Sequence, residues 1–356
     1  MRLGLVGPLP PPNGGMAMQT RQLKQLLRQE GINVTLVQTN APYRPRVIEN
    51  LKGVRALFRL LPYLWRIWRL CGNSDVIHLM ANSGWSWQLF AAPVLWIGWL
   101  RGTPVIVNYR GGEARQYLES SARWVKPSMA RASRLVVPSG FLQQVFSDFG
   151  IHSDIIPNII DLETFSPVAQ VPQKEGFTLA ITRNLEPIYG LDTAIRAAAI
   201  ASDDIPGLHL RIAGSGPQKE ELLNLAVSLG IAQMVSFEGR LDREHIVALY
   251  READAMLNPT RVDNMPNSVL EALACAVPVI STDVGGIPHI VEHGKTAVLV
   301  KPDDEEAMAS AIVALYRDRE LQDCLQTQGR EEVARYTWDR VRPQWLSLYR
   351  YCEAAG

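Results

Sequence analysis

The sequence lacks several features that would assign a protein to a class at once. It has only four cysteines, at positions 71, 275, 324 and 352, and none forms a C-x-x-C pair. A chain of 356 residues with this spacing has no disulfide framework and no cysteine metal cluster; the pattern is typical of a reducing compartment. An Asp-x-Asp motif is also missing, and we therefore expect no metal ion at the functional site.

Long apolar runs are missing as well. The longest one extends from Leu89 to Leu100 and ends at Arg101. This is well short of the roughly 20 residues that a spanning helix needs, so we expect no transmembrane segment. Met1 and Arg2 lead directly into strand-like residues without a signal peptide. The expected location is the cytoplasm.

Net charge is zero, because 36 Lys and Arg balance 36 Asp and Glu, but the charges are unevenly distributed. Residues 1–165 carry 18 basic and 9 acidic side chains, and residues 166–356 carry 18 and 27. A positive half is suited to phosphate, nucleic acid or an anionic membrane. No groove-reading or base-stacking motif accompanies it, so nucleic acid is not an expected partner.

Short apolar runs alternate with helical patterns in two series, on either side of a proline-bearing stretch at residues 155–172. The strand-like runs of the first series are 3–6, 34–38, 76–79, 105–108 and 135–138. Those of the second are 178–182, 208–213, 235–238, 255–258, 279–281 and 297–300. The rhythm predicts two doubly wound α/β domains of Rossmann-like type, at residues 1–165 and 166–339, with a ligand in a cleft at the carboxyl ends of their strands.

The most informative stretch runs from Asp263 to Pro288. Asn267 is a favourable N-cap and predicts a helix over residues 268–276. Free amides at such an N-terminus bind anions. Glu271, about one turn into the helix, is better suited to ribose hydroxyls than to a phosphate, and Asp263 in the preceding loop can reach a sugar hydroxyl. The alternative is that Glu271 only complements the helix dipole and Asp263 is a turn residue.

This stretch resembles family 4 of the retaining glycosyltransferases, which have the GT-B fold. The family carries two acids with seven residues between them, a helix of small residues, Pro-Val and a Gly-Gly-x-Pro turn. Glu271 matches the acid that holds the donor ribose, and Asp263 stands where the family usually has Glu against the transferred sugar. The resemblance also implies that the donor meets the loop and helix start, at Asn264, Met265, Asn267 and Ser268.

The resemblance covers nearly the whole chain. Gly14 and Gly15 lie in a loop like the family's glycine loop, where backbone amides approach the donor phosphates. Arg183 matches the arginine that the family uses on the diphosphate. Arg240 belongs to a segment like the one whose backbone meets the nucleotide base. The alternatives are that the glycines form an ordinary turn and that Arg183 is a solvated loop residue.

Two positions depart from the family pattern. Tyr189 stands where the family normally has Lys, so one phosphate-neutralising charge is missing. Arg110 stands where many members have a His near the sugar. A retaining reaction of this type needs no protein base, because the leaving diphosphate can take the acceptor proton, and we hypothesise that Arg110 stabilises that leaving group. His78 is the other acceptor-side candidate, although a structural role suits it equally.

The resemblance implies a metal-independent, retaining hexosyltransferase. It would move a sugar from a nucleotide diphosphate sugar, such as a UDP- or GDP-sugar, to a glycan, lipid-linked or small-molecule hydroxyl, without a cofactor. In the family fold a C-terminal helix, here residues 340–356, crosses back onto the first domain, and donor binding closes the cleft. A degenerate protein that only binds nucleotide sugar, or a sugar-nucleotide epimerase, are the alternatives.

Residues 51–70 have an amphipathic pattern with two distinct arcs. The basic arc contains Lys52, Arg55, Arg59, Arg66 and Arg69. The apolar arc contains Leu51, Val54, Leu57, Phe58, Leu61, Leu64, Trp65 and Trp68, and Pro62 predicts a kink or a split. The pattern fits a helix at the inner face of an anionic membrane, or a helix that buries its apolar arc against a sheet.

Overall fold

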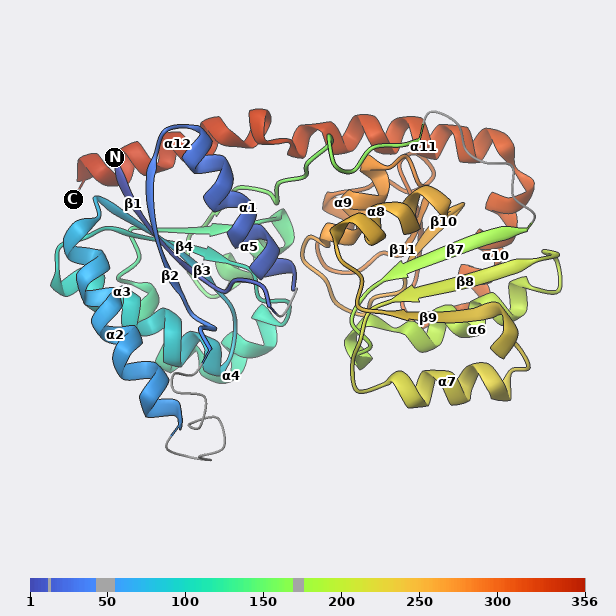
Figure 1. Ribbon diagram of the computed structural model, residues 1–356, viewed down its shortest axis with the longest axis horizontal. Helices are drawn as coiled ribbons and strands as arrows, with labels where there is room; N and C mark the ends of the chain where they lie inside the picture. Colours follow the sequence, from blue (N-terminus) through green and yellow to red (C-terminus); the bar gives the residue numbers. More distant parts are fainter. Residues whose placement is uncertain (12–13, 43–54, 169–175, 356) are drawn as a thin grey trace. The chain divides into compact units, whose positions relative to one another are not determined.

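The computed structural model describes residues 1–11, 14–42, 55–168 and 176–355. The chain divides into two compact units (Figure 1). Unit 1 comprises residues 1–158 and 341–356, and unit 2 comprises residues 159–340. The structure therefore places the first boundary between Asn158 and Ile159, earlier than the expected one at residue 165.

Unit 1 is built on a six-stranded parallel sheet with the order β2-β1-β3-β4-β5-β6. Its strands are β1 (Arg2–Gly7), β2 (Asn33–Gln38), β3 (Val76–Ala81), β4 (Val105–Tyr109), β5 (Arg134–Val137) and β6 (Asp154–Ile155). The first five were expected within two residues at each end; the short β6 was not. The strand order reverses between β1 and β3, which is where doubly wound sheets bind ligands.

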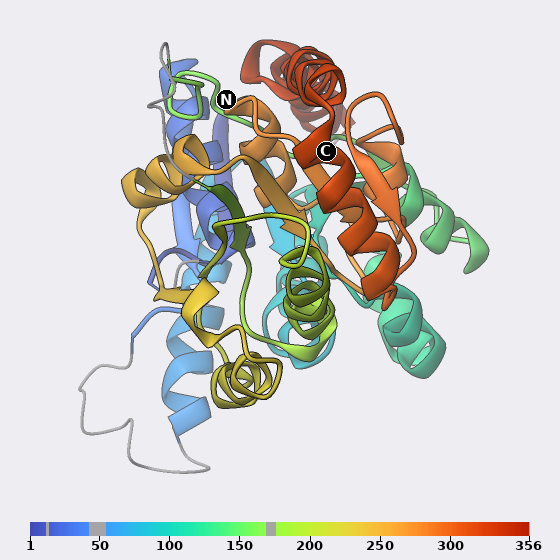
Figure 2. The same cartoon turned by 90° about the vertical axis from the view of Figure 1, so that its right-hand side faces the viewer.

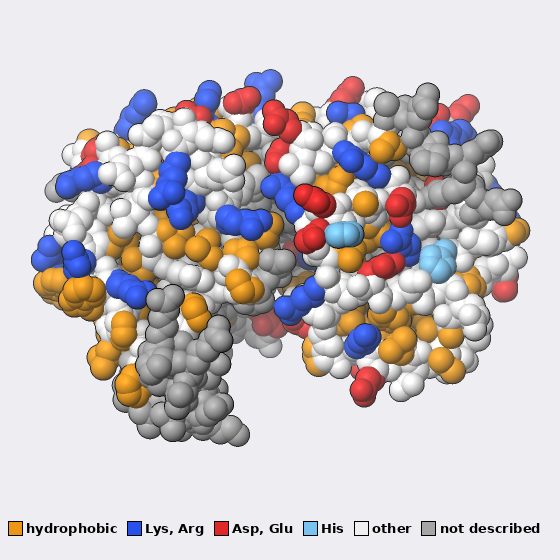
Figure 3. Space-filling view, in the orientation of Figure 1, with side chains coloured by type: hydrophobic (Ala, Val, Ile, Leu, Met, Phe, Trp, Pro, Cys, Tyr) orange, Lys and Arg blue, Asp and Glu red, His pale blue; other side chains and the backbone are white. Residues whose placement is uncertain are grey.

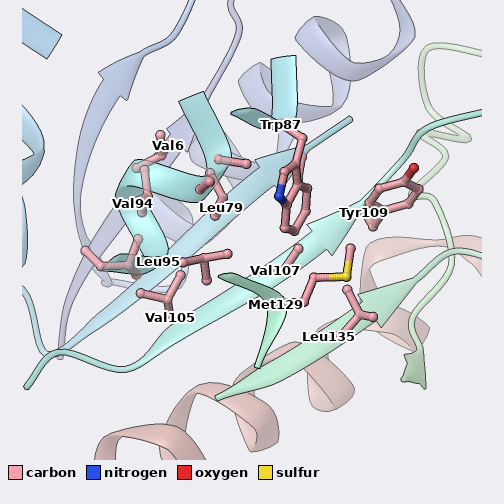
Figure 4. Close-up of a cluster of buried hydrophobic side chains, with 14 of the residues drawn as sticks. Val6, Leu79, Trp87, Val94, Leu95, Val105, Val107, Tyr109, Met129 and Leu135 are labelled. Carbon is pink, nitrogen blue, oxygen red and sulfur yellow. The ribbon is translucent and has the colours of Figure 1, made fainter. Parts of the chain in front are cut away.

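The helices of unit 1 cover this sheet. They are α1 (Gly15–Gln29), α2 (Arg55–Asn73), the π-helix η2 (Trp87–Ala91), α3 (Ala92–Leu100), α4 (Ala114–Met129) and α5 (Gly140–Asp148). Figure 4 shows Trp87 and the α3 side chains Val94 and Leu95 in the same apolar cluster as Leu79 and Val107 of the sheet. Trp87 is fully buried, and its indole nitrogen donates to Ser128 Oγ at 3.0 Å, so α4 is tied to the same cluster.

Helix α2 is continuous across Pro62, so the expected split does not occur. Its sheet-facing side consists of Tyr63, Ile67, Leu70 and Cys71, all at most 4% exposed. Four members of the predicted apolar arc instead face away from the core: Phe58, Leu61, Trp65 and Trp68 are 51%, 63%, 59% and 45% exposed. Of the two alternatives for this helix, burial of the apolar arc against the sheet does not hold for these four side chains, because α2 has apolar side chains on two faces. Leu51, Lys52 and Val54, and the side chains of Arg55 and Leu57, lie outside the described residues.

Unit 2 has a second six-stranded parallel sheet, with the order β12-β11-β10-β7-β8-β9. Its strands are β7 (Phe177–Thr182), β8 (Leu208–Ala213), β9 (Val235–Gly239), β10 (Ala255–Asn258), β11 (Val279–Thr282) and β12 (Val298–Val300). Alternate residues of β10 point to opposite faces: Leu257 joins the cluster with α6 and α10, and Met256 joins the cluster with α9. The order of strands reverses between β7 and β10.

Helices lie on both faces of this sheet (Figure 2). They are α6 (Leu191–Ala201), α7 (Lys219–Ser228), α8 (Arg243–Glu252), α9 (Asn267–Ala274), α10 (Glu305–Arg317) and α11 (Arg319–Val333). The last helix, α12 (Trp338–Ala355), begins in unit 2, and from Val341 onward it belongs to unit 1. Its Trp345 and Tyr349 are at most 1% exposed. Among the described helices, none combines the length and apolar character required to cross a membrane.

Candidate functional site

The strand-order reversal of unit 2 places an arginine beside an asparagine. Arg183 directly follows β7, and Asn258 ends the neighbouring strand β10. Arg183 Nε and Nη2 donate to Asn258 Oδ1 at 3.0 and 2.9 Å. Asn258 is fully buried and its amide nitrogen donates to Ser281 Oγ of β11 at 2.9 Å. The guanidinium is thus fixed from the adjacent strands at the carboxyl edge of the sheet.

Asp263 forms an ion pair with Arg183, and both side chains are nearly buried. The second carboxylate oxygen of Asp263 accepts from its neighbour's amide, Asn264 N, at 2.9 Å. The Gly-Gly turn explains how this loop is held: Gly286 N donates to the Asp263 carbonyl at 2.9 Å, and Gly285 has φ +56°. A Cβ on Gly285 would lie 2.1 Å from that carbonyl oxygen, so only glycine fits there.

Helix α9 begins at Asn267, with Pro266 in the N-cap position and no side-chain capping bond. The predicted N-cap role of Asn267 is therefore wrong, and the helix ends at Ala274 rather than at residue 276. Ser268 is buried, and its hydroxyl has no hydrogen-bond partner among the described residues. A buried hydroxyl without a partner at a helix N-terminus marks a place where a ligand oxygen can bind.

Glu271 lies one turn further along α9 and is partly buried. Its Oε2 accepts from Tyr250 Oη of α8 at 3.5 Å, and the same hydroxyl lies 2.5 Å from Thr182 Oγ1. Burial raises the pKa of Glu271 to about 7, although Arg243, the Tyr250 hydrogen bond and Arg183 oppose the shift. A carboxylate held in this way is a strong acceptor for hydroxyl donors once it is ionised.

The edge of β8 and β9 contributes a further basic residue. Arg240 follows β9, and its Nε donates to Ser215 Oγ at 2.5 Å. Gly214 lies in the same loop, and a Cβ there would clash with the carbonyl oxygen of Arg183 at 1.8 Å. The loop after β8 therefore packs closely on the backbone of Arg183.

Tyr189, at the position where the family has Lys, lies beside Arg183: the guanidinium carbon is 5.0 Å from the centre of the ring. Such a contact holds the guanidinium by cation–π attraction. Tyr189 thus supports the remaining cation, although it supplies no charge of its own.

Unit 1 presents Arg110 at the carboxyl end of β4. Its Nε donates to Asn108 Oδ1 at 2.8 Å, while its Nη1 is buried without a hydrogen-bond partner among the described residues. No ion pair with a carboxylate involves Arg110 within the described part of the chain. Burial lowers the pKa of this guanidinium to about 10. The charge is therefore held in a place where an anionic ligand would stabilise it.

His78 is fully buried in β3, which does not fit the predicted role as an acceptor contact. Its Nδ1 lies 2.7 Å from Tyr349 Oη of α12, and its Nε2 lies 3.0 Å from Asn108 Nδ2. Its ring also packs on Trp345, with the centroids 4.6 Å apart. Burial, together with the nearby charge of Arg110, lowers the pKa of His78 to about 3, so the imidazole is neutral. His78 acts here as a structural link from α12 through Asn108 to Arg110.

Gly14 and Gly15 lie where the first strand leads into its helix. Gly14 is the N-cap of α1 in an extended conformation, and Met18 N donates to its carbonyl at 3.0 Å. A Cβ on Gly14 would meet nothing within 4 Å. Among the described residues, therefore, nothing crowds the Cβ position of Gly14 at this helix N-terminus.

Some residues of these arrangements were missed at the level of sequence. Asn258, Ser281 and Tyr250 fix Arg183 and Glu271, and Asn108 connects Arg110 to His78. The available signal was a buried polar residue at the end of an apolar strand, as in Ala255–Asn258 and Val105–Tyr109. A polar side chain at that position needs a partner, and it faces the edge where doubly wound sheets bind ligands.

Comparison with known families finds two matches along the chain. Residues 13–164 match the family described as Glycosyltransferase Family 4, and residues 163–332 match Glycosyl transferases group 1. Together they extend over both units.

Several curated relatives are similar to part of the chain, at 29–35% sequence identity. A D-inositol 3-phosphate glycosyltransferase of Saccharomonospora viridis is 29% identical over 247 residues, which are 64% of this chain and 57% of that protein. A GDP-mannose-dependent alpha-(1-6)-phosphatidylinositol monomannoside mannosyltransferase of Mycobacterium tuberculosis is 29% identical over 218 residues, 57% of each chain. An exopolysaccharide phosphotransferase of Streptomyces coelicolor is 35% identical over 196 residues, 54% of this chain and 20% of that protein. The chain thus spans little more than half the length of these relatives, or less.

Solved structures match over the full length. Sucrose-phosphate synthase of Thermosynechococcus elongatus superposes with a TM-score of 0.79 at 21% identity, covering 100% of both chains. HepE of Anabaena in complex with UDP-glucose superposes with a TM-score of 0.77 at 17% identity, covering 99% of this chain and 100% of that one. At these identities the likeness shows the fold, which is GT-B. The chain belongs to the group 1, or family 4, glycosyltransferases, a family of retaining enzymes.

Proposed function

We propose that the protein is a retaining glycosyltransferase that moves a sugar from a nucleoside diphosphate sugar to an acceptor hydroxyl. The observation that carries the proposal is the cluster at the strand-order reversal of unit 2. There Arg183 is held by Asn258 and Asp263, and the buried hydroxyl of Ser268 has no partner among the described residues. A fixed cation and a helix N-terminus on one sheet edge suit a diphosphate.

The donor contacts follow from this arrangement. The diphosphate binds Arg183 and the amides and hydroxyl at the start of α9, from Asn264 and Met265 to Asn267 and Ser268. Glu271 accepts the ribose hydroxyls, and Asp263 accepts a hydroxyl of the sugar. Arg240 lies at the β9 end, on the side of the base.

Unit 1 supplies further positive groups. The resemblance assigns the backbone amides of Gly14 and Gly15, at the start of α1, to the donor phosphates, and it assigns Arg110 to the diphosphate as it leaves. The leaving diphosphate then takes the proton of the acceptor hydroxyl. The hydroxyl oxygen attacks the anomeric carbon from the same face, so the product keeps the anomeric configuration. Because amides and arginines neutralise the diphosphate, we expect no requirement for a divalent metal.

Two measurements test the proposal. A thermal-shift screen of UDP- and GDP-sugars identifies the donor, since a ligand at 100 times its dissociation constant stabilises by about 2.7 kcal/mol. NMR of the product then gives the anomeric configuration. An inverted anomer, or loss of all activity in chelator, contradicts the mechanism. Turnover of Arg110→Ala within twofold of the wild type contradicts the role of Arg110.

A protein that binds the nucleotide sugar without transferring the sugar is the second candidate. This candidate is favoured by Tyr189, because a Tyr in place of the family's usual Lys leaves one positive charge fewer to neutralise the phosphates. Slow hydrolysis of the bound donor by purified protein distinguishes the two, because an assembled transferase site activates the donor even when water is the only acceptor. Tight donor binding with no hydrolysis supports the binder.

A further inference from the structure

Unit 1 carries an unusual set of exposed aromatic side chains on two neighbouring helices. Six of the nine tryptophans in the sequence are exposed, and all six belong to unit 1. Trp65 and Trp68 lie on the outer face of α2, and Trp96 and Trp99 lie on α3. Helices α2 and α3 pack against each other, since Thr103 Oγ1, just after α3, donates to the Cys71 carbonyl of α2 at 2.7 Å. These four tryptophans therefore belong to one helical layer.

Arginines join these tryptophans into one surface. The guanidinium of Arg69 lies 4.9 Å from the Trp65 ring centre, and that of Arg101, at the end of α3, lies 4.7 Å from Trp68 on α2. Arg131 lies 3.4 Å from Trp96 and 5.0 Å from Trp99. We name these seven residues the tryptophan–arginine surface: Trp65, Trp68, Trp96, Trp99, Arg69, Arg101 and Arg131. In Figure 3 apolar side chains with basic ones beside them gather at the edge of unit 1 over α2.

Negative charge is almost missing from this part of the chain. Between Glu49 and Glu113 the sequence has a single acid, Asp75, and Arg2 neutralises it with a hydrogen-bonded ion pair at 2.6 Å. A monomer rarely exposes so many large apolar side chains without a partner for them. Two copies facing each other through this surface would bring like charges together. An anionic partner is therefore favoured over self-association.

We infer that the tryptophan–arginine surface binds the surface of an anionic lipid bilayer. Indole rings prefer the boundary between headgroups and acyl chains, and arginines beside them reach the lipid phosphates. The outward apolar face of α2, with Phe58 and Leu61, enters that boundary, while Tyr63 and Ile67 keep the opposite face in the core. The surface needs neither donor nor acceptor, so it does not rest on the proposed transferase activity.

The test is flotation of the purified chain with phosphatidylcholine vesicles, with and without phosphatidylglycerol, at low and high salt. We expect co-flotation with the anionic vesicles at low salt and its loss at high salt. Removing two exposed charges with Arg66→Gln and Arg69→Gln should weaken partitioning about 30-fold, from roughly 1 kcal/mol per basic side chain. The matched control is Arg317→Gln with Arg319→Gln, which removes two exposed charges from unit 2 and should have no such effect.

The apolar part is tested with Trp65→Ser and Trp68→Ser together, against Leu223→Ser and Val227→Ser on the exposed face of α7. We expect the tryptophan pair to lose flotation and the α7 pair to keep it, with unchanged donor affinity and unfolding temperature in both. Brominated lipids should quench the tryptophan fluorescence of the wild type. No co-flotation at low salt, equal effects of the surface and control variants, or a dimer that the tryptophan variant makes monomeric would overturn the inference. Flotation without transferase activity would leave it standing and refute only the proposed function.

Discussion

Arg110 in unit 1 and Arg183 in unit 2 each directly follow a strand at the carboxyl edge of a parallel sheet, but their charges are compensated differently. Arg183 is paired with Asp263 and bonded twice to Asn258. Arg110 has one neutral partner, Asn108, and no carboxylate within the described residues. Arg183 is thus a rigid binding group whose position is fixed before any ligand arrives. Arg110 is a buried cation whose charge is not compensated, and a bound anion would stabilise it.

The largest expected effect is on donor affinity at the compensated arginine. Arg183→Ala should raise the donor dissociation constant roughly 10–150-fold, since removing a charged hydrogen-bond partner costs about 1.5–3 kcal/mol. Calorimetry with the donor measures it, with Arg317→Ala as the control. Unchanged affinity would remove Arg183 from the diphosphate site.

Stability should respond in opposite directions at the two arginines. Arg183→Met should lower the free energy of unfolding by about 1–3 kcal/mol, because Asp263 and Asn258 lose their partner in a nearly buried place. Arg110→Met should leave it unchanged or raise it, because burial opposes the charge, as the lowered pKa of Arg110 indicates. Urea unfolding of both variants checks the contrast. Equal destabilisation would mean that Arg110 also has a partner that stabilises it.

Glu271 extends the comparison to pH, because its pKa is raised to about 7. Ribose hydroxyls are bound best by the ionised carboxylate, so nucleoside diphosphate affinity should fall as the pH drops below about 7, by at most about tenfold per pH unit. The free energy of unfolding depends on pH in the opposite direction. Because the pKa of Glu271 is raised above its usual 4.5, this residue stabilises the fold most at low pH, and its contribution is lost as the pH rises from 4.5 to 7. Calorimetry between about pH 5.5 and 8 measures how the nucleoside diphosphate affinity changes with pH. Glu271→Gln should flatten it, and a slope that persists in this variant would belong to another group.

The smallest expected effect concerns the chain of hydrogen bonds that links Tyr349 through His78 and Asn108 to Arg110. Tyr349→Phe removes the hydroxyl beside His78 Nδ1, and we expect a loss of about 1 kcal/mol in stability. Turnover should fall less than in Arg110→Ala, with donor affinity unchanged. Tyr351→Phe, which removes a hydroxyl from an exposed side chain of the same helix, is the control. A turnover loss equal to that of Arg110→Ala would mean that α12 takes part in the site directly.

Sequence patterns predicted the strands of both sheets apart from the short β6, because apolar periodicity reports burial in each element. They failed where an element has two apolar faces. In α2 both the Tyr63–Ile67 side and the Trp65–Trp68 side are apolar, and only the packing decides which of them meets the sheet. The prediction of Asn267 as the N-cap was wrong for a different reason: Pro266, one residue earlier, already has the extended backbone that the N-cap position needs.

The candidate site was predictable in its charged residues but not in the neutral ones that hold them. Asp263, Glu271 and Arg183 could be placed from their spacing and their resemblance to the family. Asn258 and Tyr250 come from other elements, and their contacts depend on the packing of β10 and α8. His78 showed the reverse problem, since a residue type that is common in active sites occupies the core.

Helix α12 has a consequence for synthesis of the chain. Unit 2 is one continuous stretch, residues 159–340, but unit 1 is completed only by residues 341–356. On the ribosome, unit 1 therefore emerges first and is finished last: until Trp345 and Tyr349 are made, His78 lacks the side chains that cover it. Released chains truncated after Arg340 should expose this apolar side of unit 1 and bind chaperones, although their unit 2 is complete.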